Sequence, residues 1–171
     1  MRFFDVVKKR RSVRNFLPAP IAEDELRRIL EAANAAPSAG NQQSYEIYVV
    51  MEKRRRESLA RAAREQLFVA GAPVSLVFCT NQARSESRYG KRADLYAVQD
   101  ATIACTVAML AAAAQGLATV WVGSFEEDAV RRVIGAPPGT VPVAILPVGR
   151  AAEVPQAPGR RELEDLVHWE G

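Results

Sequence analysis

The sequence contains few of the residues from which metal sites and disulfides are built. Its 171 residues include two cysteines, Cys79 and Cys105, and one histidine, His168. The cysteines lie far apart without C-x-x-C spacing, and no His/Cys cluster has the spacing of a zinc site. A chain of this length can bury a sufficient core without such cross-links. We therefore expect two buried cysteines that act as small apolar side chains, and no metal.

Motifs and segments that define several other protein classes are also missing. No G-x-G-x-x-G follows an expected strand and no G-x-x-x-x-G-K-[ST] is present, which disfavours an ordinary dinucleotide-binding domain and a P-loop protein. No segment is uniformly apolar over the roughly 18 residues of a membrane span, and the N-terminus has no apolar signal core. No repeat or linker divides the chain. These absences predict a single domain over residues 1–171, in the cytoplasm and without a membrane partner.

The net charge is only +3, but the positive charges are unevenly placed. They gather in three clusters: Lys8–Arg11 with Arg14, Lys53–Arg56, and Arg160–Arg161. Such clusters attract phosphate, whether of a nucleotide cofactor or of a nucleic acid. Acidic runs at 23–25 and 126–128 argue against a broad nucleic-acid face. A focused phosphate site fits better, and a basic nucleic-acid-binding module is the alternative from another class.

Apolar periodicity predicts alternating helices and strands. Helices are expected over 3–11, 22–36, 54–68, 98–115, 124–135 and 163–167, and strands over 45–51, 74–80, 119–122 and 141–148. Residues 81–97 are expected to form a polar loop. Ser124 and Glu127 have capping-box spacing at the start of the fifth helix. This alternation predicts a three-layer α/β sandwich but not the order of its strands.

The helix expected over 98–115 differs from the others because it is apolar on nearly every face. A helix of this kind is buried on all sides. We expect the sheet to cover one side and a partner subunit to cover another.

The basic segment Arg10-Arg11-Ser12-Val13-Arg14 is the first candidate site. In an extended chain, Arg10, Ser12 and Arg14 point to one side, so that two guanidinium groups and a hydroxyl can converge on one anion. The planar fork of donors on arginine matches the oxygens of a phosphate. For such a pentapeptide taken alone, a solvated run of charge is the more common explanation.

The segment Pro37-Ser38-Ala39-Gly40-Asn41-Gln42-Gln43 is the second candidate site. Gly40 permits unusual backbone angles, and three consecutive side-chain amides offer both donors and acceptors. The pyrimidine edge of a flavin, with its alternating donors and acceptors, needs such partners. An Asn-rich turn is the alternative interpretation.

These motifs occur together in a characteristic order. RRSVRNF is followed by PSAGNQQ, then by GLATVWVGSF at 116–125 and PVAILPVG at 142–149. Segments 88–100 and 161–168 add to the pattern, which covers essentially the whole chain and resembles the short members of the FMN-dependent nitroreductase family. The resemblance implies an α+β fold, a nitroreductase-like three-layer α/β/α sandwich with a central mixed sheet. It also implies an intertwined homodimer with FMN at the subunit interface.

The resemblance implies a role for individual residues. FMN would be bound by thirteen of them: Arg10, Arg11, Ser12, Arg14, Pro37, Ser38, Asn41, Gln43, Gln66, Val122, Gly123, Arg160 and Arg161. The arginines and Ser12 would hold the phosphate and ribityl chain, with Arg14 nearer the pyrimidine end. The residues of 37–43 would come from the other subunit, Gln66 would face the ring, and the backbone of Val122 and Gly123 would approach the flavin N5 and O4.

The implied activity is hydride transfer from NADH or NADPH to FMN N5, and then to an electron-poor small molecule such as a nitroaromatic or a quinone. Positioning suffices for such chemistry, so no catalytic acid or base is expected. His168 is expected to pack or to lie at the surface, while Tyr89 and Tyr96 either line the substrate face or anchor a loop. Specialised branches of the family, dehalogenase-like or flavin-fragmenting, are the alternative.

Overall fold

The centre of the structure, a computed structural model that describes residues 2–171, is a four-stranded sheet. Its strands are β1 (Tyr45–Val50), β2 (Val74–Thr80), β3 (Ala118–Thr119) and β4 (Pro142–Gly149). The order is β1-β2-β4-β3, and each neighbouring pair is antiparallel. The parallel pairing is a single bridge between Ser12 and Thr119, which attaches the N-terminal segment to the β3 edge. The mixed character of the sheet is therefore confined to this edge.

The two central strands are apolar because helices cover both of their faces. Every residue of β2 is buried, and seven of the eight residues of β4 are. Strands buried on both faces are typically continuous apolar runs, as these two are. The strand predicted over 74–80 is confirmed without change at either end.

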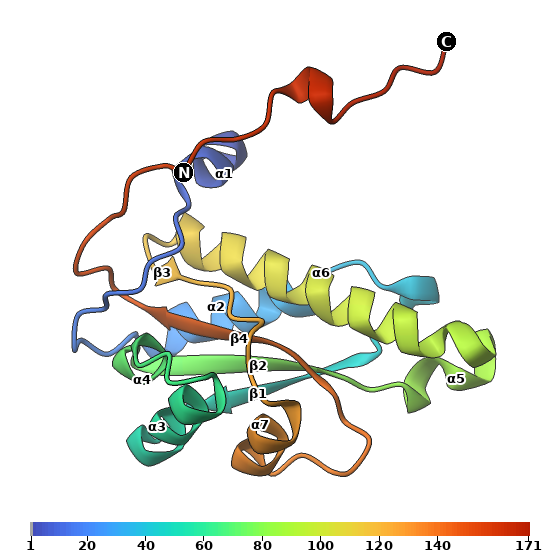
Figure 1. The fold of residues 1–171 in the computed structure, drawn as a ribbon, viewed down its shortest axis with the longest axis horizontal. Coiled ribbons are helices and arrows are strands. Elements are labelled where there is room, and N and C mark those ends of the chain that lie inside the picture. The colour runs from blue at the N-terminus through green and yellow to red at the C-terminus, as the bar shows by residue number, and fades with distance from the viewer. Residues whose placement is uncertain (1) are drawn as a thin grey trace.

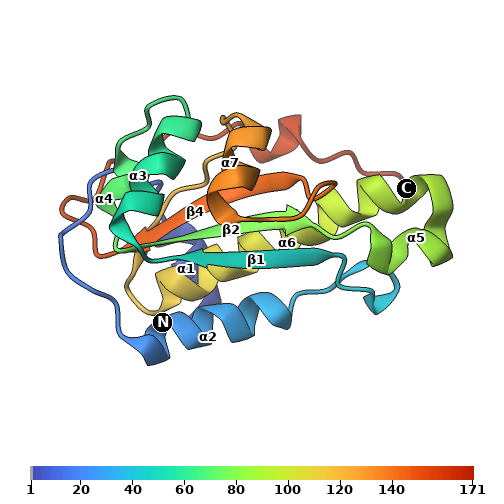
Figure 2. The same cartoon turned by 90° about the horizontal axis from the view of Figure 1, so that it is seen from below.

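Helices α2 (Glu23–Asn34) and α6 (Ala93–Ala114) cover one face of the sheet (Figures 1 and 2). The periodicity of α2 is confirmed, because Leu26, Ile29 and Ala33 are its buried residues. Helix α6 approaches the sheet closely through a row of buried small residues: Ala97, Ala101, Ala104, Cys105, Ala108 and Ala112. Its other side stays exposed and carries large apolar side chains: Leu95, Val98 and Ile103.

Helices α3 (Lys53–Ala62), α4 (Phe68–Gly71) and α7 (Glu127–Ile134) form the opposite layer (Figure 1). Leu59, Val69 and Val130 are fully buried in the core cluster that also contains Val77 and Ile145 of the sheet. Two apolar cores, one on each face of the sheet, make the molecule the predicted three-layer sandwich.

Both ends of the chain leave the sheet on the side of α6 (Figure 1). Helix α1 (Phe3–Lys9) buries only Val6, while Phe3 and Phe4 are exposed. From Glu153 onward the tail is almost entirely exposed, including its single helical turn, the 3-10 helix Leu163–Asp165. The two termini therefore present apolar side chains that this chain does not cover.

Three predictions about local structure are wrong. The loop expected over 81–97 is instead helix α5 (Ala83–Tyr89), a 3-10 turn over 90–92 and the start of α6. The helix expected over 54–68 breaks because Arg64 and Glu65 adopt φ of 56° and 58°. Ser124 does not cap α7, whose N-cap is Glu126.

The helical run 83–114 is long and apolar enough, by length and composition alone, to cross a membrane. A helix that forms part of a protein core passes the same test, and α6 packs on the sheet and on α2. The run is therefore weak evidence for a membrane span.

Removing a core side chain from the α3 layer is expected to destabilise the fold. Leu59→Ala should lower the free energy of unfolding by about 2–5 kcal/mol, since Leu59 is 0% exposed and a cavity would remain. Urea unfolding measures the change. The matched control is Leu67→Ala, because Leu67 is 70% exposed and its truncation should change the value by less than about 0.5 kcal/mol. Equal losses in both variants would contradict the described packing.

Candidate functional site

A cavity of about 220 Å³ lies where the two ends of the chain meet. The segment after α1 contributes four of its lining residues, Arg10, Arg11, Ser12 and Arg14. The C-terminal segment contributes Pro155, Gln156, Pro158 and Arg160. We call this the arginine cavity, because four guanidinium groups line it and no carboxylate does.

The backbone of the N-terminal segment aims these side chains. The Val13 N–H donates to the Thr119 carbonyl at 3.0 Å, so residues 12–13 run extended along β3. Val13 points into the core and is buried. The predicted alternation therefore places Arg10, Ser12 and Arg14 on the cavity side. The C-terminal segment is tied alongside by the Ala152 N–H, which donates to the Asn15 carbonyl at 2.9 Å.

The charges in the arginine cavity repel one another. Partial burial, followed by the charges of Arg160 and Arg11, lowers the pKa of Arg10. Arginine stays protonated even so, because its ordinary pKa is far above neutral pH. An anion in the cavity would relieve this repulsion, and the forked donors fit phosphate.

Two of the predicted phosphate ligands make hydrogen bonds to backbone carbonyls of this chain. Arg11 lines the cavity, yet its Nη1 donates to the carbonyls of Lys8 at 2.8 Å and Arg10 at 2.9 Å. Arg161 is not among the lining residues, and its Nη2 donates to the Asp165 carbonyl at 2.6 Å. Of the residues predicted to bind the phosphate, the cavity thus brings together Arg10, Arg11, Ser12, Arg14 and Arg160 but not Arg161.

Arg14 extends the arginine cavity toward a second group of predicted residues. Its Cζ lies 5.8 Å from the centre of the Phe68 ring, at the start of α4. Just before that helix, the Gln66 Nε2 donates to the Ala63 carbonyl at 2.7 Å and to the Ser124 carbonyl at 3.0 Å. The Gln66 amide thereby joins the turn between α3 and α4 to the segment that follows β3.

The backbone of Val122 is occupied, whereas that of Gly123 is available. Val122 exchanges two hydrogen bonds with Ile145, at 3.0 and 2.9 Å, and is buried. Gly123 is exposed, and no backbone hydrogen bond among residues 2–171 involves it. A Cβ at Gly123 would lie 3.2 Å from the Trp121 Nε1. Of the two, Gly123 is the residue whose amide can meet a ligand.

The amide loop, which we define as Pro37–Gln43, is fastened by a residue that the sequence analysis missed. Asp100 of α6 is 1% exposed, and its two carboxylate oxygens accept from the N–H of Ala39 at 2.9 Å and of Ser44 at 3.2 Å. Its sequence signal was present, because Asp100 is the one carboxylate of α6 beyond the first turn. A buried carboxylate needs such partners, and here the partners fix both ends of the loop.

Left-handed backbone and internal hydrogen bonds shape the amide loop. Gly40, Asn41 and Gln43 have φ of 51°, 57° and 47°. The Ser38 Oγ accepts from the Gln43 N–H at 3.0 Å, and the Gln43 Nε2 donates to the Asn41 Oδ1 at 2.9 Å. A Cβ at Gly40 would lie 2.2 Å from the Tyr89 hydroxyl, so any other residue there would have to displace that side chain and adopt a left-handed backbone. Tyr89 therefore acts as a loop anchor.

The amide loop and the arginine cavity lie at opposite ends of α6. Asp100, in the second turn of the helix, holds the loop, whereas Arg10 and Arg11 approach the last turn at Ala113 and Gly116. Thirteen residues separate Asp100 from Ala113, which corresponds to about 20 Å along the helix axis. One chain thus brings the phosphate residues together but does not bring Pro37, Ser38, Asn41 and Gln43 to them.

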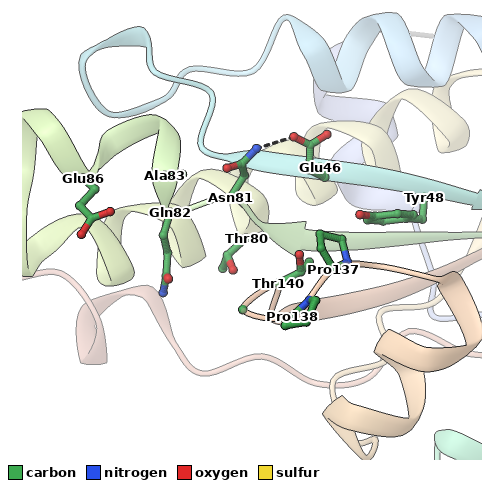
Figure 3. A pocket seen from close by; sticks show the side chains of 11 residues that line it. Glu46, Tyr48, Thr80, Asn81, Gln82, Ala83, Glu86, Pro137, Pro138 and Thr140 are labelled. Carbon is green, nitrogen blue, oxygen red and sulfur yellow. Dashed lines mark hydrogen bonds between the residues drawn. The ribbon is translucent and has the colours of Figure 1, made fainter.

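A second cavity, of about 420 Å³, opens at the other end of the sheet (Figure 3). Its lining includes Glu46 and Glu86 but neither lysine nor arginine. The Asn81 Nδ2 donates to the Glu46 Oε1 at 2.6 Å, and this bond orients the carboxylate (Figure 3). Two carboxylates repel phosphate, so this cavity is unsuited to an anion despite its greater volume.

The remaining reactive side chains do not form a site. Cys79 and Cys105 are buried as predicted, and burial, with a smaller contribution from the Glu46 charge, raises the pKa of Cys79 to about 12. His168 lies exposed on the C-terminal tail. Among residues 2–171 no group of three or more His, Cys, Asp or Glu could hold a metal ion.

The sequence profile of the Nitroreductase family matches residues 7–79 and 62–150. The chain belongs to the nitroreductase family. A Thermus thermophilus relative named NADH dehydrogenase is 31% identical, with 94% of this chain and 92% of the relative covered. A Bacillus subtilis relative named FMN reductase [NAD(P)H] is 30% identical, with 94% and 70% covered.

The nitroreductase fold is also found in the solved structures. NADPH:FMN oxidoreductase from Vibrio harveyi, complexed with NAD⁺, superposes with a TM-score of 0.90 at 25% identity. The match covers 99% of this chain and 77% of that one. The nitroreductase-like α+β architecture expected from the sequence motifs is thereby confirmed.

Asp100→Asn tests how the amide loop of this nitroreductase is held. The substitution places an NH₂ group opposite one of the two backbone N–H donors, which should cost about 1–3 kcal/mol of stability. Hydrogen exchange at Ala39 and Ser44 should accelerate. Asp94→Asn, an exposed change on the same helix, should alter stability by less than about 0.5 kcal/mol. Unchanged exchange at both amides in Asp100→Asn would show that the carboxylate does not order the loop.

Proposed function

We propose that this nitroreductase is an NAD(P)H-dependent FMN oxidoreductase that works as a cytoplasmic homodimer. Its two half-reactions carry hydride from NADH or NADPH, through FMN, to an electron-poor small molecule such as a nitroaromatic or a quinone. The observation that carries the proposal is the arginine cavity, where both ends of the chain place cations around a space that no carboxylate enters.

The donor set of this cavity fits the phosphate of FMN. Guanidinium forks pair with phosphate oxygens, and a serine hydroxyl adds a short neutral donor. Arg10, Arg14 and Arg160 would bind the phosphate, with Ser12 and one side of Arg11. Arg161 does not line the cavity and would have to turn toward it to join them.

The ring-binding residues come from two copies of the chain in this proposal. Pro37, Ser38, Asn41 and Gln43 lie about 20 Å along α6 from the phosphate residues of their own chain. A second copy can bring its amide loop to the ring, opposite the Gln66 and Gly123 of the first. The exposed apolar side chains on α6 and at both termini are suited to a partner surface.

When bound, FMN supplies a two-electron carrier that accepts hydride at N5 and passes it on. The chain's own residues would bind FMN and orient its ring. Arg14 places positive charge beside the turn that carries Gln66, where it would stabilise negative charge on the reduced ring. Gly123 offers a free backbone amide close to that turn, since Gln66 bonds the adjacent Ser124. No acid or base side chain is assigned a proton-transfer role.

The other basic cluster disfavours the nucleic-acid alternative. Lys53 lies 3.9 Å from Glu57, and Arg55 lies 3.3 Å from Glu52. Arg56 is turned inward and donates to the carbonyls of Ala70 and Ala72. Of the four cations of this cluster, three are thus engaged within the chain, which leaves little free charge for a polyanion.

Removing two of the cavity cations should abolish flavin retention. The unaltered protein should be yellow, release FMN on denaturation and bleach anaerobically with NADH or NADPH. Arg10→Gln/Arg14→Gln should weaken FMN binding by at least about 100-fold, because charge-assisted hydrogen bonds to the phosphate are lost. FMN titration measures the affinity, and circular dichroism reports whether the variant stays folded.

The matched control is Arg54→Gln/Arg132→Gln, which removes the same charge from α3 and α7. Neither residue lines the arginine cavity, and the control should retain FMN. A folded Arg10→Gln/Arg14→Gln variant with stoichiometric FMN would show that the phosphate binds elsewhere. A colourless protein that cannot be reconstituted with FMN would contradict the proposed function itself.

A further inference from the structure

Residues 83–94, which comprise α5, the 3-10 turn after it and the start of α6, carry a second group of cations that lies outside the arginine cavity. Arg84, Arg88, Lys91 and Arg92 are all exposed. No salt bridge among residues 2–171 joins any of them to a carboxylate. The two acidic residues of the segment are Glu86, which lines the separate cavity of Figure 3, and Asp94 on α6.

This segment is attached directly to the amide loop. The Arg84 Nε donates to the Gln42 carbonyl at 2.9 Å. The guanidinium of Arg88 lies 3.0 Å from the place that a Cβ on Gly40 would take. Arg88 therefore lies beside the loop that is proposed to line the flavin ring, and Lys91 and Arg92 follow it in the next turn of the chain. We call Arg88, Lys91 and Arg92 the cationic rim.

Two aromatic side chains orient the cationic rim. Tyr89 and Tyr96 pack edge to face with ring centres 4.8 Å apart. The Arg88 Cζ lies 5.7 Å from the centre of the Tyr89 ring, and the Arg92 Cζ lies 5.0 Å from that of Tyr96. Cation–π contacts of this kind hold a guanidinium in place while leaving its N–H donors free. Arg88 and Arg92 thus present oriented donors that have no carboxylate partner among residues 2–171.

We propose that the cationic rim recognises the 2′-phosphate of the reductant and makes the enzyme prefer NADPH to NADH. The inference rests on the proposed function, because it requires the nicotinamide to lie on a flavin beside the amide loop. The phosphate of FMN has its own proposed site in the arginine cavity, whose lining includes none of the rim residues. NADPH differs from NADH by one phosphate, and arginine forks match its oxygens.

The test compares kcat/KM for NADPH and NADH with one acceptor at low ionic strength. The unaltered enzyme should prefer NADPH by about tenfold or more, the size of one charge-assisted hydrogen bond. Arg88→Gln/Arg92→Gln should bring the ratio close to one, mainly by raising KM for NADPH. Added salt should lower the ratio of the unaltered enzyme, because exposed charges are screened.

The control variant Arg54→Gln/Arg132→Gln loses the same amount of positive charge and should keep the preference for NADPH over NADH. The ratio does not depend on how much enzyme is folded or loaded with FMN, and Arg92→Gln alone provides a milder variant. A ratio near one in the unaltered enzyme, a ratio unaffected by Arg88→Gln/Arg92→Gln, or an equal loss in the control would each overturn the proposal.

A separate measurement tests whether the cationic rim recognises the electron acceptor instead of the coenzyme. If the rim served an anionic acceptor, 4-nitrobenzoate would be favoured over neutral 4-nitrobenzamide while both coenzymes reacted equally, and the coenzyme proposal would be wrong. Failure of the proposed function has another signature, in which neither NADH nor NADPH bleaches the flavin. Equal bleaching by both would remove only the inference about the rim.

Discussion

Repulsion among guanidinium groups in the arginine cavity is the constraint that makes binding of an anion there favourable. Arg10, Arg11, Arg14 and Arg160 line one small space without a carboxylate, and partial burial adds to the cost of charge on Arg10. The fold sustains this arrangement because the N-terminal segment bonds along β3 and the C-terminal segment bonds back to Asn15. An arrangement that is unfavourable when empty of anions becomes favourable when a phosphate binds.

Helix α6 keeps the arginine cavity and the amide loop of one chain apart, so that a complete flavin site would require two chains. Its row of small residues lets it lie close on the sheet, and Asp100 near its start fixes the amide loop. The same helix ends beside Arg10 and Arg11. The two halves of the proposed flavin site are thereby held apart within one chain, and the exposed apolar side of α6 offers a surface through which a second copy can supply the missing half.

Much of the fold could be predicted because burial and periodicity are local signals. The continuous apolar run of β2 and the face of α2 follow directly from side-chain spacing, as does the alternation that brings Arg10, Ser12 and Arg14 together. Helix α5 was missed because its charged surface resembles a loop. The break at Arg64 and Glu65 was missed because left-handed backbone there is marked by neither glycine nor proline. The bonds of Asp100 span 61 and 56 residues, and such long-range contacts leave no periodic signal.

Subunit complementation tests most directly whether one flavin is shared between two chains. The variants Arg10→Gln/Arg14→Gln and Ser38→Ala/Asn41→Gly each disable one half of the site, and glycine is compatible with the left-handed backbone of Asn41. Refolded together in equal amounts, they should regain FMN in about a quarter of all sites, because half of the dimers are mixed and each has one intact site. FMN content no higher than that of the two variants measured separately would contradict the shared site.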